Sequence, residues 1–210
     1  MTNPNYRHII MIADRSGSMQ SCREATEEGI NGLFKSQAGE PGTGTASLYE
    51  FDNAHDTVFE HVPLAEAPAY VLSPRGGTAL LDAVGFAFTR EGEWLASLPE
   101  DERPGTVVAV IATDGEENSS REYTAEQIRA MVTTQRETYG WQVLFIGANL
   151  DAVKTGATYG IPVTASMTYA TTNTGTASSY AAVSRVVTAT ASGLGGGFTS
   201  AERAAAVDAP

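Results

Sequence analysis

The chain has 210 residues, of which 42% are hydrophobic and 18% are charged, so it can bury a sizeable core. Its 13 basic and 25 acidic residues give a net charge of −12. Nucleic acids and anionic lipid surfaces attract basic patches, so we expect no nucleic-acid partner and no membrane partner.

The acidic excess lies in one part of the chain. Residues 1–140 contain 22 acidic and 10 basic side chains, whereas residues 141–210 contain three of each. The whole excess of −12 therefore belongs to the first two thirds of the sequence. We expect this part to bind a cation rather than an anion.

Three features favour a cytoplasmic location. Cys22 is the only cysteine, which excludes an intrachain disulfide and a cysteine-based zinc site. The start of the chain, Met1 to Arg7, is polar and lacks the apolar segment of a signal peptide. No apolar run approaches the ~20 residues of a membrane span.

The first half of the chain predicts a strand, a helix, a hairpin and a second helix. The uninterrupted apolar run at residues 8–13 is typical of a strand buried on both faces, as in a parallel sheet. Apolar residues recur every three or four positions over residues 22–34, which predicts an amphipathic helix. Residues 45–51 and 56–62 predict a hairpin, and another helix begins near Leu80.

The second half continues the alternation of strands and helices. Two buried strands are predicted at residues 107–112 and 141–146, and a weak final strand at residues 163–168. Helices are predicted at residues 124–132 and 180–191, and a short helix or a turn at residues 150–159. The helix predicted at residues 124–132 starts with a capping-box pattern, formed by Thr124 and Gln127. The alternation predicts an α/β layer fold with a mostly parallel sheet.

Oxygen-bearing side chains gather where these strands end. In a doubly wound sheet, ligands bind outside the carboxyl ends of the strands. Three loops in that region carry such side chains: Asp14, Ser16, Ser18, Thr78 and Asp114. An all-oxygen set without histidine or cysteine favours a hard divalent cation, Mg²⁺ first, with Mn²⁺ or Ca²⁺ as alternatives, over zinc or copper. The two carboxylates balance the charge of such a cation.

The same residues carry a resemblance to a known family. The segment Asp14-Arg15-Ser16-Gly17-Ser18 resembles the D-x-S-x-S motif of von Willebrand factor A (vWA) domains. Thr78 and Asp114 match the two other parts of the metal-ion-dependent adhesion site (MIDAS) of that family, in the same order. The motif is therefore complete, and it looks more like the small freestanding microbial or phage type than the extracellular adhesion type.

The resemblance implies a fold and a domain boundary. It implies a Rossmann-like, three-layer α/β/α sandwich with a mostly parallel central sheet, one antiparallel edge strand, and residues 8–13 at the centre of the sheet. It covers residues 6–192 as a vWA domain, and residues 193–210 are expected to be a glycine-rich stop followed by a loosely held tail.

The resemblance also implies a function. Ser16, Ser18 and Thr78 would bind the cation directly, and Asp14 and Asp114 would bind it directly or through water. An Asp or Glu of a protein partner would complete the shell, which makes the chain an intracellular protein-binding module and not an enzyme. Small microbial members often work with a separate ATPase or in stress and conflict systems, so such a component is a candidate partner.

Other readings of the site residues stay open from sequence alone. Asp14, Ser16 and Ser18 are also suited to capping a helix, and Asp114 is suited to a turn. Two further functions are a metal-dependent hydrolase, with Glu116 or Glu117 as base, and an assembly component. Arg15 and Arg75 are candidates for orienting a partner carboxylate or for compensating nearby acidic residues.

The remaining polar candidates are assigned structural roles. His8, His55 and His61 are expected at the surface or in packing, because none lies in a predicted metal loop. Asn149 and Asp151 are expected to cap a helix, and Cys22 is expected in the core.

Overall fold

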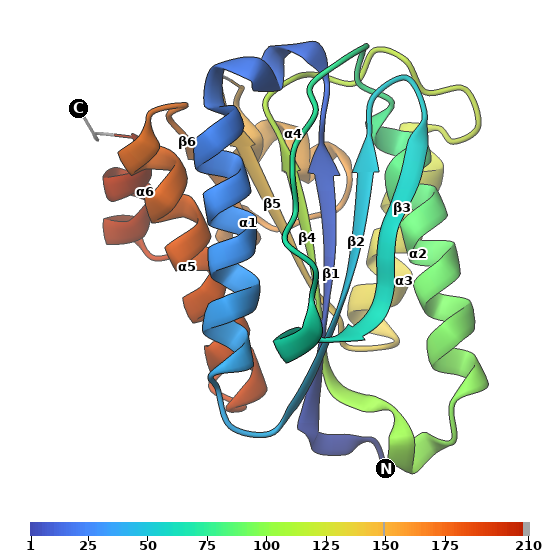
Figure 1. Ribbon diagram of the computed structural model, residues 1–210. Coiled ribbons are helices and arrows are strands. Elements are labelled where there is room, and N and C mark those ends of the chain that lie inside the picture. Colours follow the sequence, from blue (N-terminus) through green and yellow to red (C-terminus); the bar gives the residue numbers. More distant parts are fainter. Residues whose placement is uncertain (149, 208–210) are drawn as a thin grey trace.

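The centre of the protein is a six-stranded sheet. The computed structural model describes residues 1–148 and 150–207. Its strands are β1 (Asn3–Asp14), β2 (Thr43–Phe51), β3 (His55–Pro63), β4 (Pro104–Thr113), β5 (Gln142–Ala148) and β6 (Ser166–Tyr169). They lie in the order β3-β2-β1-β4-β5-β6, and every adjacent pair is parallel except β2 with β3 (Figure 1). The mostly parallel sheet with one antiparallel edge strand is confirmed.

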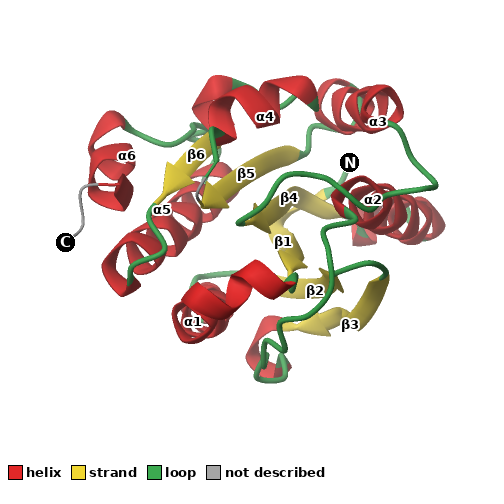
Figure 2. Ribbon diagram, turned by 90° about the horizontal axis from the view of Figure 1, so that it is seen from above, coloured by secondary structure: helices red, strands yellow, loops and turns green. Residues whose placement is uncertain are grey.

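Helices cover both faces of this sheet. They are α1 (Arg23–Ala38), α2 (Leu80–Ser97), α3 (Ala125–Glu137), α4 (Ala152–Thr158), α5 (Asn173–Ala191) and α6 (Ser200–Val207). In the view from above, α1 and α5 lie on one face and α2, α3 and α4 on the other (Figure 2). The Rossmann-like three-layer sandwich is therefore confirmed. No helix within the described ranges is long and apolar enough to cross a membrane.

The central strands follow directly from their apolar runs. The stretch from Ile9 to Ala13 in β1 is fully buried, and so is the stretch from Val108 to Val110 in β4. Each large apolar side chain buried in this way contributes roughly 1.5–3 kcal/mol to folding. Because β1 lies between β2 and β4, its end is placed in the middle of one edge of the sheet.

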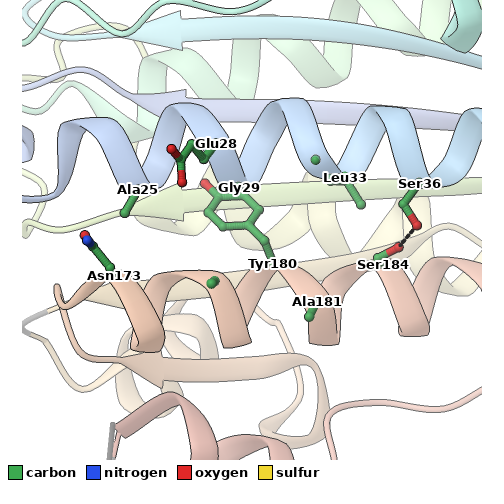
Figure 3. Close-up of a pocket in the computed structure, with 11 residues that line it drawn as sticks. Ala25, Glu28, Gly29, Leu33, Ser36, Asn173, Tyr180, Ala181 and Ser184 are labelled. Atoms are coloured by element: carbon green, nitrogen blue, oxygen red, sulfur yellow. Dashed lines mark hydrogen bonds between the residues drawn. The ribbon is translucent and has the colours of Figure 1, made fainter. Parts of the chain in front are cut away.

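A local signal fixes the start of α3, and a close tertiary contact fixes how α1 packs on α5. The capping box predicted for α3 is present, because Gln127 N–H donates to Thr124 Oγ1 (3.3 Å) and Thr124 N–H donates to Gln127 Oε1 (2.8 Å). On the opposite face, Gly29 of α1 lies against the ring of Tyr180 of α5 (Figure 3). A Cβ at Gly29 would lie 2.2 Å from that ring, so the close approach of the two helices requires glycine.

The prediction of a loosely held tail is wrong for residues 198–207. Phe198 is buried and its N–H donates to Thr164 O (2.8 Å), and the following residues form α6. Ala206 of α6 is fully buried beside α5 and β6. The small residues of this segment gave no sequence signal for α6, because this helix is stabilised by tertiary packing rather than by large apolar side chains. The packed unit therefore extends to Val207, and residues 208–210 lie outside the described residues.

Candidate metal centre

Three loops meet at the carboxyl ends of β1 and β4. They are the turn between β1 and α1, the loop before α2, and the loop between β4 and α3, all at the top of Figure 1. Backbone hydrogen bonds join them, because Gly17 N–H donates to Gly76 O (3.2 Å) and Asn118 N–H donates to Thr78 O (3.1 Å). The loops are therefore held against one another by the backbone, independently of the side chains that they present.

Three of the predicted ligands converge in this place. Ser18 Oγ lies 2.7 Å from Asp114 Oδ1 and 3.1 Å from Ser16 Oγ, and Ser16 Oγ lies 3.5 Å from the same carboxylate oxygen. Oxygen ligands of an octahedral Mg²⁺ with bonds of ~2.0–2.1 Å are spaced by ~2.9 Å. The other oxygen, Asp114 Oδ2, is buried and has no hydrogen-bond partner in the described part of the chain. This donor set fits a small, hard cation.

Thr78 joins the same group of oxygens. A Cβ built on Gly115 would lie 3.4 Å from Thr78 Oγ1 and 3.9 Å from Ser18 Oγ, so both hydroxyls lie next to that glycine. Thr78 is buried, and its N–H donates to Asn118 Oδ1 (2.9 Å), which orients the start of α2. We call the set of Asp14, Ser16, Ser18, Thr78 and Asp114 the loop cluster.

Asp14 lies behind the other members of the loop cluster. It is fully buried, and its carboxylate accepts hydrogen bonds from Ser16 N–H and from the Thr113 hydroxyl, each 2.6 Å long. Both oxygens are therefore engaged, which suits contact with a cation through water. Burial raises the pKa of Asp14 to about 6 and also raises the pKa of Asp114.

The two arginines near the site point elsewhere. Arg15 is buried, and it forms ion pairs with Glu50, Asp52 and Asp56 of the β2–β3 hairpin. Of the two candidate roles of Arg15, orienting a partner carboxylate does not fit, because its guanidinium is buried against acidic residues of the hairpin. Arg75 is exposed, and its Nε lies 2.6 Å from Asp52 Oδ2.

Glu117 holds the loop after β4 in place. Its carboxylate accepts hydrogen bonds from the N–H groups of Ser119 (2.8 Å), Ser120 (2.7 Å) and Leu81 (3.0 Å). It therefore connects this loop to the first turn of α2 and is not merely a solvated side chain. Glu116 is exposed.

Some of the structural roles predicted for other residues are confirmed and others are not. Asp151 caps α4 by accepting from Lys154 N–H (3.0 Å), and Cys22 is buried in the core, as predicted. Asn149 lies outside the described residues. His8 and His61 are more than packing residues, because both contact the buried Glu91. The sequence carried no signal of this contact, since the three residues are far apart in the chain.

Comparisons with known proteins were made for the sequence and for the fold. No protein-family model matches the sequence, and no curated protein matches it. The fold is similar to proximal thread matrix protein 1 (PTMP1) from the mussel byssus, with 14% identity and a TM-score of 0.62 over 87% of this chain and 46% of that one. It is also similar to von Willebrand factor type A from Catenulispora acidiphila, with 14% identity and a TM-score of 0.60 over 87% and 42%.

A third structure matches over nearly its whole length. The vWF domain of the type V pili tip protein Mfa5 from Porphyromonas gingivalis has 9% identity and a TM-score of 0.56, over 85% of this chain and 94% of that one. The chain spans less than half the length of PTMP1 and of the Catenulispora protein. One structure of PTMP1 has a zinc-occupied MIDAS motif. At these identities the similarity establishes the fold, and this chain has the fold of a von Willebrand factor type A domain.

Proposed function

We propose that this protein is a metal-dependent protein-interaction module. Ser16, Ser18, Thr78 and Asp114 would hold Mg²⁺, and Asp14 would contact it through water. The observation that carries the proposal is the convergence of three side-chain oxygens, spaced by 2.7 to 3.5 Å, beside the unpaired Asp114 Oδ2. The PTMP1 structure with a zinc-occupied MIDAS supports metal binding at this place in the fold.

The two shortest oxygen–oxygen distances of the site favour magnesium. Calcium takes longer bonds of ~2.3–2.6 Å and six to eight ligands, which would space neighbouring oxygens by ~3.3–3.7 Å in an octahedral arrangement. Two of the three observed distances, 2.7 Å from Ser18 to Asp114 and 3.1 Å from Ser18 to Ser16, are shorter than that, and the third, 3.5 Å from Ser16 to Asp114, lies within the calcium range. Manganese shares the preference for oxygen ligands and is the alternative that a binding experiment must compare.

The loop cluster is arranged to receive an acidic group. When bound, the cation supplies a Lewis-acidic coordination position for a carboxylate of a partner protein. Ser18 and Gly17 are exposed, so the cluster is open to solvent on that side. The two aspartates balance a divalent charge, and the remaining donors of the set are neutral hydroxyls, so they add no repulsion toward an incoming Asp or Glu.

The overall charge constrains the partner. The chain carries −12, so the surface of the partner around its docking carboxylate must be basic or apolar to avoid repulsion. The exposed Arg75, in the loop before α2, already pairs with Asp52, so it does not remove this requirement. A separate ATPase or a component of a stress or conflict system, inside the cell, is our candidate partner from the resemblance of the motif.

We propose binding rather than catalysis. A cation-activated hydrolase needs a general base near the metal, and the sequence offers Glu116, which lies exposed in its loop, and Glu117 as candidates. The carboxylate of Glu117 is instead occupied by backbone N–H groups of its own loop and of α2. This structural engagement supports a site that holds a cation for recognition.

The proposal is tested by affinity capture from a native lysate, with Mg²⁺ and with EDTA. We expect the wild-type protein to retain a partner only with Mg²⁺, and Thr78→Ala to retain none. Thr134→Ala removes a hydroxyl on an exposed face of α3 and serves as the matched control. Capture that is insensitive to EDTA, or equal capture by Thr78→Ala, would contradict the proposal.

A further inference from the structure

A second group of ligand-type side chains lies away from the loop cluster. His8 Nε2 is 3.0 Å from Glu91 Oε2, and His61 Nε2 is 3.2 Å from the same carboxylate oxygen. The three ligand atoms all lie within 4.8 Å of one another. His8 belongs to β1, His61 to the edge strand β3 and Glu91 to α2, so three separate elements contribute. We call these residues the His–Glu cluster.

The His–Glu cluster is shielded from solvent. The side chains of His8 and Glu91 are 0% exposed, and that of His61 is 24% exposed. The ring of Trp94 stacks on His61, with centroids 3.8 Å apart and planes tilted by 14°, and it also lies against His8. A carboxylate buried to this degree requires a compensating positive charge or several hydrogen bonds.

The backbone is distorted where it delivers His61. His61 has a φ of 56°, and it is the single non-glycine residue with positive φ in the described ranges. The pairing of β2 with β3 is irregular here, because Ala46 pairs with Val62 whereas Leu48 pairs with Phe59. Such a bulge redirects a side chain, and a non-glycine residue keeps this conformation only where its surroundings impose it.

Further hydrogen bonds orient the ligand atoms. His8 Nδ1 lies 2.8 Å from Thr45 Oγ1, which leaves Nε2 facing Glu91. The other oxygen of Glu91, Oε1, accepts a hydrogen bond from the Tyr49 hydroxyl (2.7 Å). Imidazole and carboxylate ligands of metal sites are typically fixed in this manner by a bond at their other atom.

We infer that the His–Glu cluster is a second metal site, which binds Zn²⁺ through His8 Nε2, His61 Nε2 and Glu91 Oε2. Ligands around a tetrahedral zinc with bonds of ~2.0–2.1 Å are spaced by ~3.3 Å, close to the observed 3.0 and 3.2 Å. Two nitrogens and one oxygen suit zinc, whereas the all-oxygen loop cluster suits Mg²⁺. The zinc would tie β3 to β1 and α2, and the inference is independent of the proposed function.

Zinc binding to the metal-free protein tests the inference. The titration is done in excess Mg²⁺, and also on Asp114→Ala, so that zinc bound at the loop cluster is not counted. We expect one zinc per chain in both proteins. At a free zinc concentration about a hundredfold above Kd, Tm should rise by about 5–10 °C. The fluorescence of Trp94 should change, because its ring stacks on His61.

A matched pair of variants assigns the ligands. His61→Asn removes the imidazole, and asparagine tolerates positive φ better than most residues, so the fold should be kept. We expect its zinc affinity to fall by at least about tenfold. His55 lies in the same hairpin, and its ring packs on Phe86. The His55→Asn variant should therefore bind zinc as the wild type does.

X-ray absorption at the zinc edge identifies the ligand type. Zinc in the wild-type protein with excess Mg²⁺ should show the outer-shell scattering of two imidazoles, which an all-oxygen site lacks. No zinc binding in excess Mg²⁺ would overturn the inference and leave the cluster as a hydrogen-bonded core network. A spectrum without imidazole, or unchanged affinity in His61→Asn, would also overturn it. If Asp114→Ala does not fold, the absorption spectrum of the wild-type protein and the zinc affinity of His61→Asn still decide the question.

Discussion

The loop cluster and the His–Glu cluster lie in the same fold but are built in opposite ways. The loop cluster is carried by three loops at the end of the sheet, offers only oxygen atoms, and reaches solvent at Ser18. The His–Glu cluster is carried by two strands and a helix, offers nitrogen and oxygen, and is nearly closed by Trp94. A group that must meet a partner lies on loops, whereas a group that joins secondary-structure elements lies between them.

The pKa of the buried carboxylate is shifted in opposite directions in the two clusters. Burial raises the pKa of Asp14 to about 6, although hydrogen bonds from Thr113 and Ser16 act in the opposite direction. Burial also acts against ionisation of Glu91, but hydrogen bonds from His61 and His8 outweigh it and hold the pKa of Glu91 well below its ordinary value. The loop cluster therefore gains most from an added cation, and the His–Glu cluster already contributes to the stability of the fold.

The largest effect is expected from Glu91→Ala. It leaves the buried His8 imidazole, the partly buried His61 imidazole and the Tyr49 hydroxyl without their shared acceptor, so the free energy of unfolding should fall by about 3–5 kcal/mol. Urea unfolding measures the loss. Glu116→Ala, at an exposed loop position, should change it by less than about 0.5 kcal/mol. Equal effects of the two substitutions would remove the structural role assigned to the His–Glu cluster.

The next largest effect concerns the response to magnesium. Wild-type protein should gain about 2.7 kcal/mol of stability at a Mg²⁺ concentration a hundredfold above Kd. Thr78→Ala and Asp14→Ala should lose this gain while keeping the fold, as seen by circular dichroism. His61→Asn should keep it, because its site is separate. A magnesium response that survives in Thr78→Ala would show that the loop cluster is not the binding site.

The response to magnesium should also depend on pH. The metal-free protein gains stability from Asp14 as pH falls from about 6 toward its ordinary pKa of 3.8, because the folded state binds the proton more tightly. Magnesium needs the ionised form, so at pH 5 it should bind about tenfold more weakly than at pH 7.5. The stabilisation by magnesium should shrink by about 1.4 kcal/mol. Thermal melts at both pH values test this, and an unchanged shift would contradict it.

The smallest effect is expected from Ser18→Ala. Ser18 is exposed, so the loss of its hydrogen bond to Asp114 should lower stability by no more than about 1 kcal/mol. Its magnesium response should weaken but persist, since Ser16 and Thr78 remain. Calorimetric titration compares it with Ser21→Ala, a neighbouring hydroxyl outside the set. If Ser18→Ala binds magnesium as the wild type does, Ser18 is not a ligand.

Much of the fold was predictable because its signals are local. The apolar runs at residues 8–13 and 107–112 became the two central strands, and the hairpin at residues 45–62 became the antiparallel edge. The capping box at Thr124 began α3 as predicted. Helix α6 was missed, because its short, alanine-rich sequence has few large apolar side chains and its stability comes from packing on α5 and β6.

The candidate site was predictable for a different reason. Its residues follow strands whose parallel arrangement brings their ends together, so a sequence pattern and a topology suffice to group them. The individual roles needed the structure. Arg15 was a candidate for orienting a partner carboxylate, yet it is buried in ion pairs with the hairpin. Glu117 was a candidate base, yet its carboxylate holds the start of α2.

The sequence by itself determined the alternation of strands and helices, the end of the sheet at which oxygen ligands gather, and the acidic character of that part of the chain. Only the tertiary structure decided that His8, His61 and Glu91 meet. Their contact depends on a bulge in β3, on the pairing of β2 with β1, and on the packing of α2 against the sheet. Such long-range juxtapositions leave no periodic or local pattern, because each element would form in the same way with other side chains at those positions.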